Sequence, residues 1–269
     1  NNSVSTKTYY SNGFAIANGG NSCSFIYDNK IDCISGDYSC RGLTVGGVKC
    51  NGSKVYNNYI EVRELKRNQE YNGCCLGGGY GVQFEYGSDN IDIFNNTIKA
   101  YASECEASSF RANPGEGGTY FEINAHDNTF EAVKQSTNPD IKAYTIKISG
   151  FNDINESIKF INNKIITNSE WILAGNLNGF NARNNIFEIN PVGKDNPFEP
   201  FMGGYWPNDQ TNAANNLRFI DNRYSDDETR AEFANSSFMF YSNNNHRYRQ
   251  DPYSNFYYSW TTNVSVIDA

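Results

Sequence analysis

Apolar and polar residues alternate along most of the chain, and pairs of acidic or amide residues interrupt the alternation. In IDIFNNTIKA (91–100), apolar residues alternate before and after the pair Asn95–Asn96, although asparagine is normally depleted in strands. Before the pair, the apolar positions share the parity of Asn95, and after it they share the parity of Asn96. Side chains of one strand alternate between two faces, so a shift by one residue indicates two strands separated by a corner. Asparagine suits such a corner because it tolerates the left-handed backbone conformation.

The same pattern occurs in seven segments of the chain. They are SFIYDNKI (24–31), SKVYNNYI (53–60), IDIFNNTI (91–98), INAHDNTF (123–130), IKFINNKI (158–165), FNARNNIF (180–187) and LRFIDNRY (217–224). The second residue of each pair is always asparagine: Asn29, Asn58, Asn96, Asn128, Asn163, Asn185 and Asn222. Spacings of 29, 38, 32, 35, 22 and 37 residues fit coils of a parallel β-helix with loops of different length.

A third apolar segment precedes each copy. These segments are GFAIANGG (13–20), GLTVGG (42–47), GVQFEYGS (81–88), SSFRAN (108–113), YTIKISG (144–150), WILAGN (171–176) and FMGGYW (201–206). Three strands per coil predict an all-β fold, a right-handed parallel β-helix of seven or eight coils. We expect one domain, with a lead-in over 1–12, seven coils over 13–235, and a last coil with an aromatic cap over 236–269.

The composition argues against several classes of partner. The net charge is −8 and no stretch concentrates Lys and Arg, so we expect no nucleic-acid partner. No apolar run is long enough to span a membrane. The chain begins at Asn1 without Met or a signal-like segment, and we expect a processed product or an excised domain.

The seven cysteines all lie within the first 105 residues and form no convincing zinc pattern. We favour an oxidising, extracellular or surface location with some disulfides, and buried free thiols are the alternative. Six N-x-S/T sequons agree with secretion, but the 41 asparagines would give about as many by chance.

The repeated column of asparagines resembles the asparagine ladder of the pectate-lyase-like superfamily, and the resemblance covers about residues 14–224. It implies a right-handed parallel β-helix with a ligand-binding groove along the first sheet, which the third segment type forms. Many members cleave acidic polysaccharides, whereas others are tailspikes, adhesins or epimerases, so the fold does not settle the function.

One outward column of the first sheet contains charged residues on consecutive coils. With apolar side chains taken as inward, the column is Ala15, Thr44, Glu85, Arg111, Lys147 and Leu173. A polysaccharide lyase must neutralise a uronate, remove a proton and protonate the leaving oxygen, and Glu85, Arg111 and Lys147 are our catalytic candidates. The alternative is an ordinary charge ladder across strands.

Further candidates flank this column. Glu104, Glu106 and Glu116 could hold Ca²⁺ or act as hydrolase acids, although no cofactor is required. Trp171, Tyr205 and Trp206 are candidates for stacking on sugar rings, and the aromatic segment 247–260 suits a cap over a coil end. His126, next to a corner, is expected to be a surface or packing residue.

Two functions remain open from the sequence. The first is recognition of an extracellular polysaccharide, with cleavage by a lyase or glycosidase. The second is a non-catalytic β-helix in an adhesin, a fibre or tailspike, or a surface structural protein. The chain lacks the motifs typical of pectate lyases, polygalacturonases and alginate epimerases. We expect a monomer, or a homotrimer if the chain belongs to a fibre.

Overall fold

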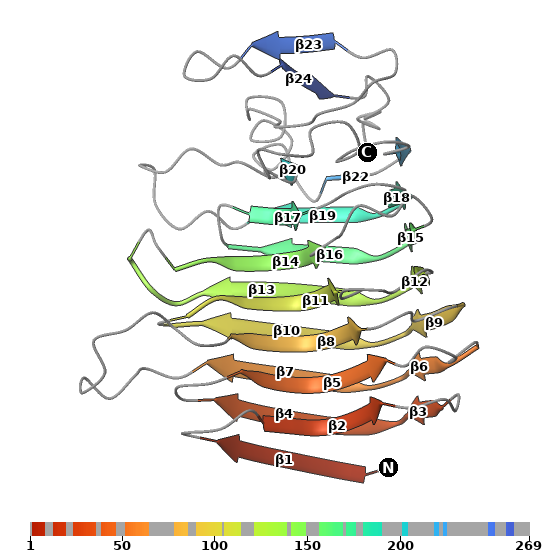
Figure 1. Cartoon of the computed structure of the whole chain (residues 1–269), viewed down its shortest axis with the longest axis vertical. Coiled ribbons are helices and arrows are strands. Elements are labelled where there is room, and N and C mark those ends of the chain that lie inside the picture. Colours follow the sequence, from red (N-terminus) through yellow and green to blue (C-terminus); the bar gives the residue numbers. More distant parts are fainter. Residues whose placement is uncertain are drawn as a thin grey trace.

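A computed structural model describes most of the repeated segments of the chain. The described residues are 2–8, 13–19, 24–35, 39–46, 52–64, 78–85, 90–103, 105–113, 121–138, 141–148, 156–168, 171–175, 180–189, 201–203, 218–220, 223–224, 247–250 and 257–260. They contain strands and no helix, so none of them forms a helix that could cross a membrane. Figure 1 shows the strands stacked in layers from the N-terminal end upward.

The strands form three parallel sheets. Sheet A has eight strands in the order β1 (Asn2–Thr8), β4 (Asn29–Ser35), β7 (Tyr59–Glu64), β10 (Thr97–Ala102), β13 (Thr129–Lys134), β16 (Lys164–Thr167), β19 (Ile186–Ile189) and β22 (Arg223–Tyr224). Sheet B has seven, in the order β2 (Gly13–Gly19), β5 (Cys40–Gly46), β8 (Gly79–Glu85), β11 (Ala107–Asn113), β14 (Ala143–Ile148), β17 (Trp171–Gly175) and β20 (Phe201–Gly203). Sheet C has seven, in the order β21 (Arg218–Ile220), β18 (Phe180–Arg183), β15 (Glu156–Ile161), β12 (Phe121–His126), β9 (Ile91–Phe94), β6 (Lys54–Tyr56) and β3 (Phe25–Tyr27).

From β2 to β22 the chain visits the sheets in the fixed rotation B, C, A. Each strand therefore pairs with the strand three elements later, and we call one B–C–A triplet a coil. The all-β class and the stacking of parallel strands are confirmed. The segments predicted for the first sheet carry the strands of sheet B, and the possible eighth coil at 236–243 lies outside the described residues.

A corner separates sheet C from sheet A in each coil. The first residue of each described Asx-Asn pair has a positive φ, between 53° and 57°, at Asp28, Asn57, Asn95, Asp127, Asn162 and Asn184. One residue in this left-handed region turns the chain, and short polar side chains tolerate it best. The shift in parity that the sequence displays is thus a physical corner.

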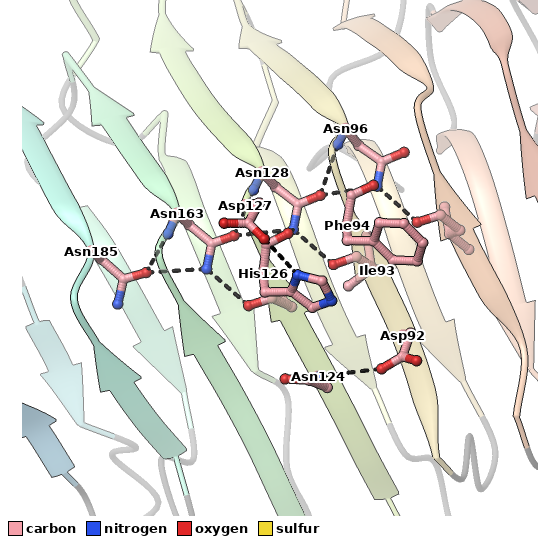
Figure 2. A network of polar contacts seen from close by, with 12 residues as sticks. Asp92, Ile93, Phe94, Asn96, Asn124, His126, Asp127, Asn128, Asn163 and Asn185 are labelled. Atoms are coloured by element: carbon pink, nitrogen blue, oxygen red, sulfur yellow. Dashed lines mark hydrogen bonds and ion pairs between the residues drawn. The ribbon is translucent and has the colours of Figure 1, made fainter.

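The second residue of each pair points inward and joins its neighbours in a ladder (Figure 2). Each Nδ2 from Asn29 to Asn163 donates to Oδ1 of the asparagine in the following coil at 2.9–3.1 Å, and Asn185 accepts the last of these bonds. In each case the same Oδ1 atom also accepts a hydrogen bond from the main-chain N–H of the asparagine in the preceding coil. For example, Asn96 N donates to Asn128 Oδ1 at 2.9 Å. These amides are buried, so the ladder satisfies polar groups that would otherwise be costly. Asn222 lies outside the described residues.

At both ends of the stack, the structure contains strands beyond the predicted coils. β1 falls within the predicted lead-in, yet it pairs in register with β4, which places Asn2 opposite Asn29. At the other end, β23 (Arg247–Gln250) and β24 (Tyr257–Trp260) form an antiparallel pair that belongs to none of the three sheets. This pair contains part of the predicted cap and lies toward the C-terminal end in Figure 1.

The core is built from columns of aligned side chains. On sheet A the fully buried residues Ile31, Ile60, Ile98, Phe130 and Ile165 stand in register on consecutive strands. Stacking of like side chains fills the interior at each coil and buries apolar surface continuously along the axis.

A disulfide between Cys33 and Cys40 links β4 to β5 inside the core. Cys105 is disulfide-bonded as well, so these three thiols are not free. We predict that replacing Cys33 and Cys40 by alanine lowers the free energy of unfolding by about 2 to 3 kcal/mol, because the bond closes a short loop. Chemical denaturation of both forms measures the difference, and equal midpoints would show that this disulfide does not stabilise the fold.

Candidate functional site

The outer face of sheet B carries two rows of side chains in register across four strands. The first row is Arg41, Tyr80, Ser108 and Tyr144, and the second row is Thr44, Gln83, Arg111 and Lys147. Neighbouring members of a row belong to adjacent strands, about 4.8 Å apart. We call these eight residues the sheet B face.

The strands depart from regular alternation between the two rows, at a point that we call the bend. Pairing is interrupted at Gly42, Gly81, Ser109 and Thr145, which pair with no residue of the adjacent strand, and the register is the same on both sides. There two consecutive residues face the core: Val82 is buried, and a Cβ added at Gly81 would lie 2.4 Å from Cγ2 of Ile98. Such a local departure from alternation is typical of a bent strand. The two rows thus lie on either side of the bend, and Tyr80 and Tyr144 are buried although they face outward.

Glu106, just before β11, connects the two rows. Its Oε1 accepts a hydrogen bond from the Tyr80 hydroxyl at 3.1 Å, and its Oε2 accepts one from Lys147 Nζ at 2.5 Å. Burial raises the pKa of the Tyr80 phenol above its usual value, and the Glu106 carboxylate adds to the shift. Tyr80 therefore stays protonated at neutral pH and acts as a hydrogen-bond donor.

Arg111 lies over the ring of Tyr80, with its guanidinium carbon 4.2 Å from the ring centroid. This cation–π contact orients the guanidinium. Among the described residues Arg111 has no carboxylate partner, and its buried Nε has no hydrogen-bond acceptor. Lys147, the next residue in its row, also lies near an aromatic ring, 5.0 Å from the centroid of Tyr144.

Glu85 occupies a different place from the one predicted. Register places Gln83, not Glu85, opposite Arg111, and pairs Glu85 with Gly46 and Asn113. Glu85 accepts hydrogen bonds from Arg41 at 3.1 Å and from Gln83. The predicted column of Glu85, Arg111 and Lys147 therefore has Gln83 in its first place.

The same register corrects both ends of that column. Ile16 and Ala17 pair with Leu43 and Thr44, and Ala15 falls at the bend. Leu173 pairs with the buried Ile146, whereas Ala174 pairs with Lys147. Strict alternation fails because it does not count the extra inward residue of the bend.

Most of the other candidates are placed only in part. The backbone of Trp171 pairs with Tyr144, which puts it in line with the first row. Glu104, Glu116, Tyr205 and Trp206 lie outside the described residues. Of the predicted metal ligands only Glu106 is described, and no group of three His, Cys, Asp or Glu residues suited to a metal occurs in the described part of the chain. The Ca²⁺ hypothesis stays a prediction.

A second aromatic feature lies on the outer face of sheet C. Tyr27, Tyr56, Phe94 and His126 form a stack with ring centroids 5.0, 5.0 and 5.1 Å apart and nearly parallel planes. His126 also contacts Asp127 Oδ2 through Nδ1 at 2.8 Å, and Figure 2 shows its ring facing that of Phe94. The inner ring faces are covered by one another, so they are unavailable to stack on sugars. His126 is a packing residue, as expected.

The sequence did not single out Arg41, Tyr80, Gln83 or Tyr144 as site residues. The signal that could reveal them is a spacing of three between outward residues, as in 80 and 83 or 144 and 147, rather than the spacing of two in a regular strand. No family model, curated protein or solved structure matches the chain.

Proposed function

We propose that the chain is an extracellular right-handed parallel β-helix of seven or eight coils, similar to the pectate-lyase-like proteins, that binds an acidic polysaccharide on the sheet B face. The rotation among three parallel sheets, the asparagine ladder and the disulfides support the fold and the location. The fold alone does not determine the function, because this fold serves several functions, so the proposal rests on the side chains of the sheet B face.

The orientation of Arg111 is the observation that carries the proposal. Its guanidinium is held over Tyr80 at 4.2 Å, yet no carboxylate of the described chain pairs with it. The protein has a net charge of −8, so an Arg side chain that is held in place and has no carboxylate partner among the described residues is open to an anionic ligand. A guanidinium binds a carboxylate through two parallel hydrogen bonds, and preorganised donors lose little entropy in doing so. A uronate carboxylate fits this requirement.

The test compares an acidic polysaccharide with the same polymer after reduction of its carboxyl groups. We predict that Arg111→Gln weakens binding of the acidic polymer by at least about tenfold, since a hydrogen bond to a charged group contributes about 1.5–3 kcal/mol. The reduced polymer should bind weakly to both forms. Titration calorimetry measures these affinities.

A matched control is available on another sheet. Lys164 is a half-exposed cation of sheet A whose Nζ lies 2.7 Å from Glu188 Oε2. Lys164→Gln removes the same charge and should change the affinity less than twofold. Equal loss in the two variants would indicate general charge attraction, and equal binding of the two polymers would refute recognition of an acidic group.

Cleavage is the second candidate function, and the contacts of Glu106 favour it. The Glu106 carboxylate accepts hydrogen bonds from the amine of Lys147 and from the phenol of Tyr80. Amines and phenols are groups that can transfer protons in elimination reactions. Unsaturated and reducing ends can be followed during incubation with the polymer that binds. Product that disappears in Lys147→Met, with binding retained, would support a lyase. Binding without product would identify a non-catalytic module of an adhesin, fibre or tailspike.

A further inference from the structure

We infer that the ligand of the sheet B face is a heteropolysaccharide, in which a neutral sugar lies next to an acidic one. This inference rests on the proposed binding of an acidic polysaccharide and adds the identity of the neighbouring unit. It is carried by the second row of the face, whose four members change in chemistry from one end to the other.

The second row has a neutral half and a cationic half. Thr44 and Gln83 stand on β5 and β8, and Arg111 and Lys147 stand on β11 and β14, all in register. Each step between strands is about 4.8 Å. A chain of sugars lying along the row therefore meets uncharged hydrogen-bonding groups first and cations next.

Buried polar atoms that have no hydrogen-bond partner lie in both halves of this row and also in the first row. They are Thr44 Oγ1, Gln83 Oε1 and Arg111 Nε in the second row, and Ser108 Oγ in the first row. Gln83 and Ser108 are 0 % exposed and Thr44 is 6 % exposed, yet all three belong to the outward rows. Buried polar atoms in folded proteins nearly always have partners. Four unpartnered atoms gathered on one face point to a ligand that supplies the missing hydrogen bonds.

The hydrogen-bonding roles of these atoms differ between the two halves of the second row. Gln83 Oε1 is an acceptor, and its Nε2 already donates to Glu85. A carboxylate could not donate to this oxygen and would be repelled by Glu85, whereas a sugar hydroxyl could donate to it. The hydroxyl of Thr44 lies opposite Gln83 in the register, and it can also form a hydrogen bond with a sugar hydroxyl. The Gln83 side of the row thus selects a neutral unit, and the Arg111 side selects an anionic one.

The experiment measures the binding of three polymers by titration calorimetry: a homopolymer of uronic acid, an alternating copolymer of uronic acid and neutral hexose, and a neutral polymer. For the unmodified chain we expect the copolymer to bind most tightly. Gln83→Met and Thr44→Val preserve side-chain volume and remove the neutral hydrogen-bonding groups. Each should weaken copolymer binding by about three- to tenfold and should change homopolymer binding by a smaller factor, so that the preference for the copolymer is lost.

The outcomes separate this inference from the proposed function. If neither acidic polymer binds, or if Arg111→Gln changes nothing, the proposed function fails. If the acidic polymers bind through Arg111 but Gln83→Met and Thr44→Val leave the copolymer preference unchanged, the heteropolymer inference is overturned. Thermal unfolding of each variant checks that the fold is intact. Ser108→Ala tests the first row independently and should also weaken copolymer binding.

Discussion

Replacing Asn128 by alanine is expected to lower the free energy of unfolding by about 3 to 5 kcal/mol. Asn128 lies in the middle of the ladder and is 2 % exposed. Its Nδ2 donates to Ile93 O at 2.8 Å and to Asn163 Oδ1 at 3.0 Å, and its Oδ1 accepts from Asn96 at 2.9 Å. Alanine removes all these bonds and leaves the Asn96 N–H buried without an acceptor, so the cost exceeds that of an exposed hydrogen bond.

Chemical denaturation followed by circular dichroism measures this loss, and the adjacent Asp127 supplies the control. Asp127 is the corner residue, with φ of 57°, and its side chain is exposed. Glycine adopts this conformation without steric cost, and the contact between Asp127 and His126 is an exposed pair of small value. Asp127→Gly should therefore change stability by less than about 0.5 kcal/mol. Similar losses at 127 and 128 would mean that the corner, rather than the ladder, determines stability.

The fold was predictable because its most frequently repeated feature, the Asx-Asn pair, is also one that few other residues can form. A corner needs a short polar residue that tolerates positive φ, and the next position needs an amide that both donates and accepts along the axis. Aspartate meets the first requirement at 28 and 127, whereas every described ladder position is asparagine. Asn2 was not predicted as a ladder position, and the register with Asn29 places it in the same column.

The site was predictable only in part. Arg111 and Lys147 were placed correctly in one row, because each follows a single apolar residue after the bend. Glu85 was placed two residues too far along β8, and Glu106, outside any strand, replaces it as the carboxylate that contacts Lys147. Tyr80 was missed because of the bend. Counting by twos through Gly81 and Val82 assigns them to opposite faces, whereas both face the core.

The bend therefore links the core to the sheet B face. It requires a residue without a side chain on the strands that carry Tyr80 and Arg41, because the facing side chains of sheet A are the large Ile98 and Ile60. At Gly42 an added Cβ would lie 2.6 Å from Cγ2 of Ile60. A change at the bend should then affect stability and ligand binding together, although no bend residue contacts the ligand in our proposal.

Gly81→Val should accordingly lower the free energy of unfolding by about 3 kcal/mol and weaken binding of the acidic polymer. The new Cβ would lie 2.4 Å from Cγ2 of Ile98 and 2.6 Å from the main-chain oxygen of Ser109, so both the core and β11 must shift. Ser109→Ala, at the aligned position of β11, is the control. It should cost only about 1 kcal/mol, because it removes one hydrogen bond from Ser109 Oγ to Thr145 O.

Denaturant midpoints give the two stabilities, and calorimetric titration of the folded variants gives the affinities. If Gly81→Val does not fold, the smaller Gly81→Ala should show the same changes in weaker form, since its Cβ meets the same atoms. A valine variant as stable as the parent chain would mean that residue 81 does not face the core. We expect binding to weaken because the shifted β8 and β11 would no longer carry Tyr80 and Arg111 to the same places. A variant that is destabilised but binds normally would show that these two residues keep their positions without the bend.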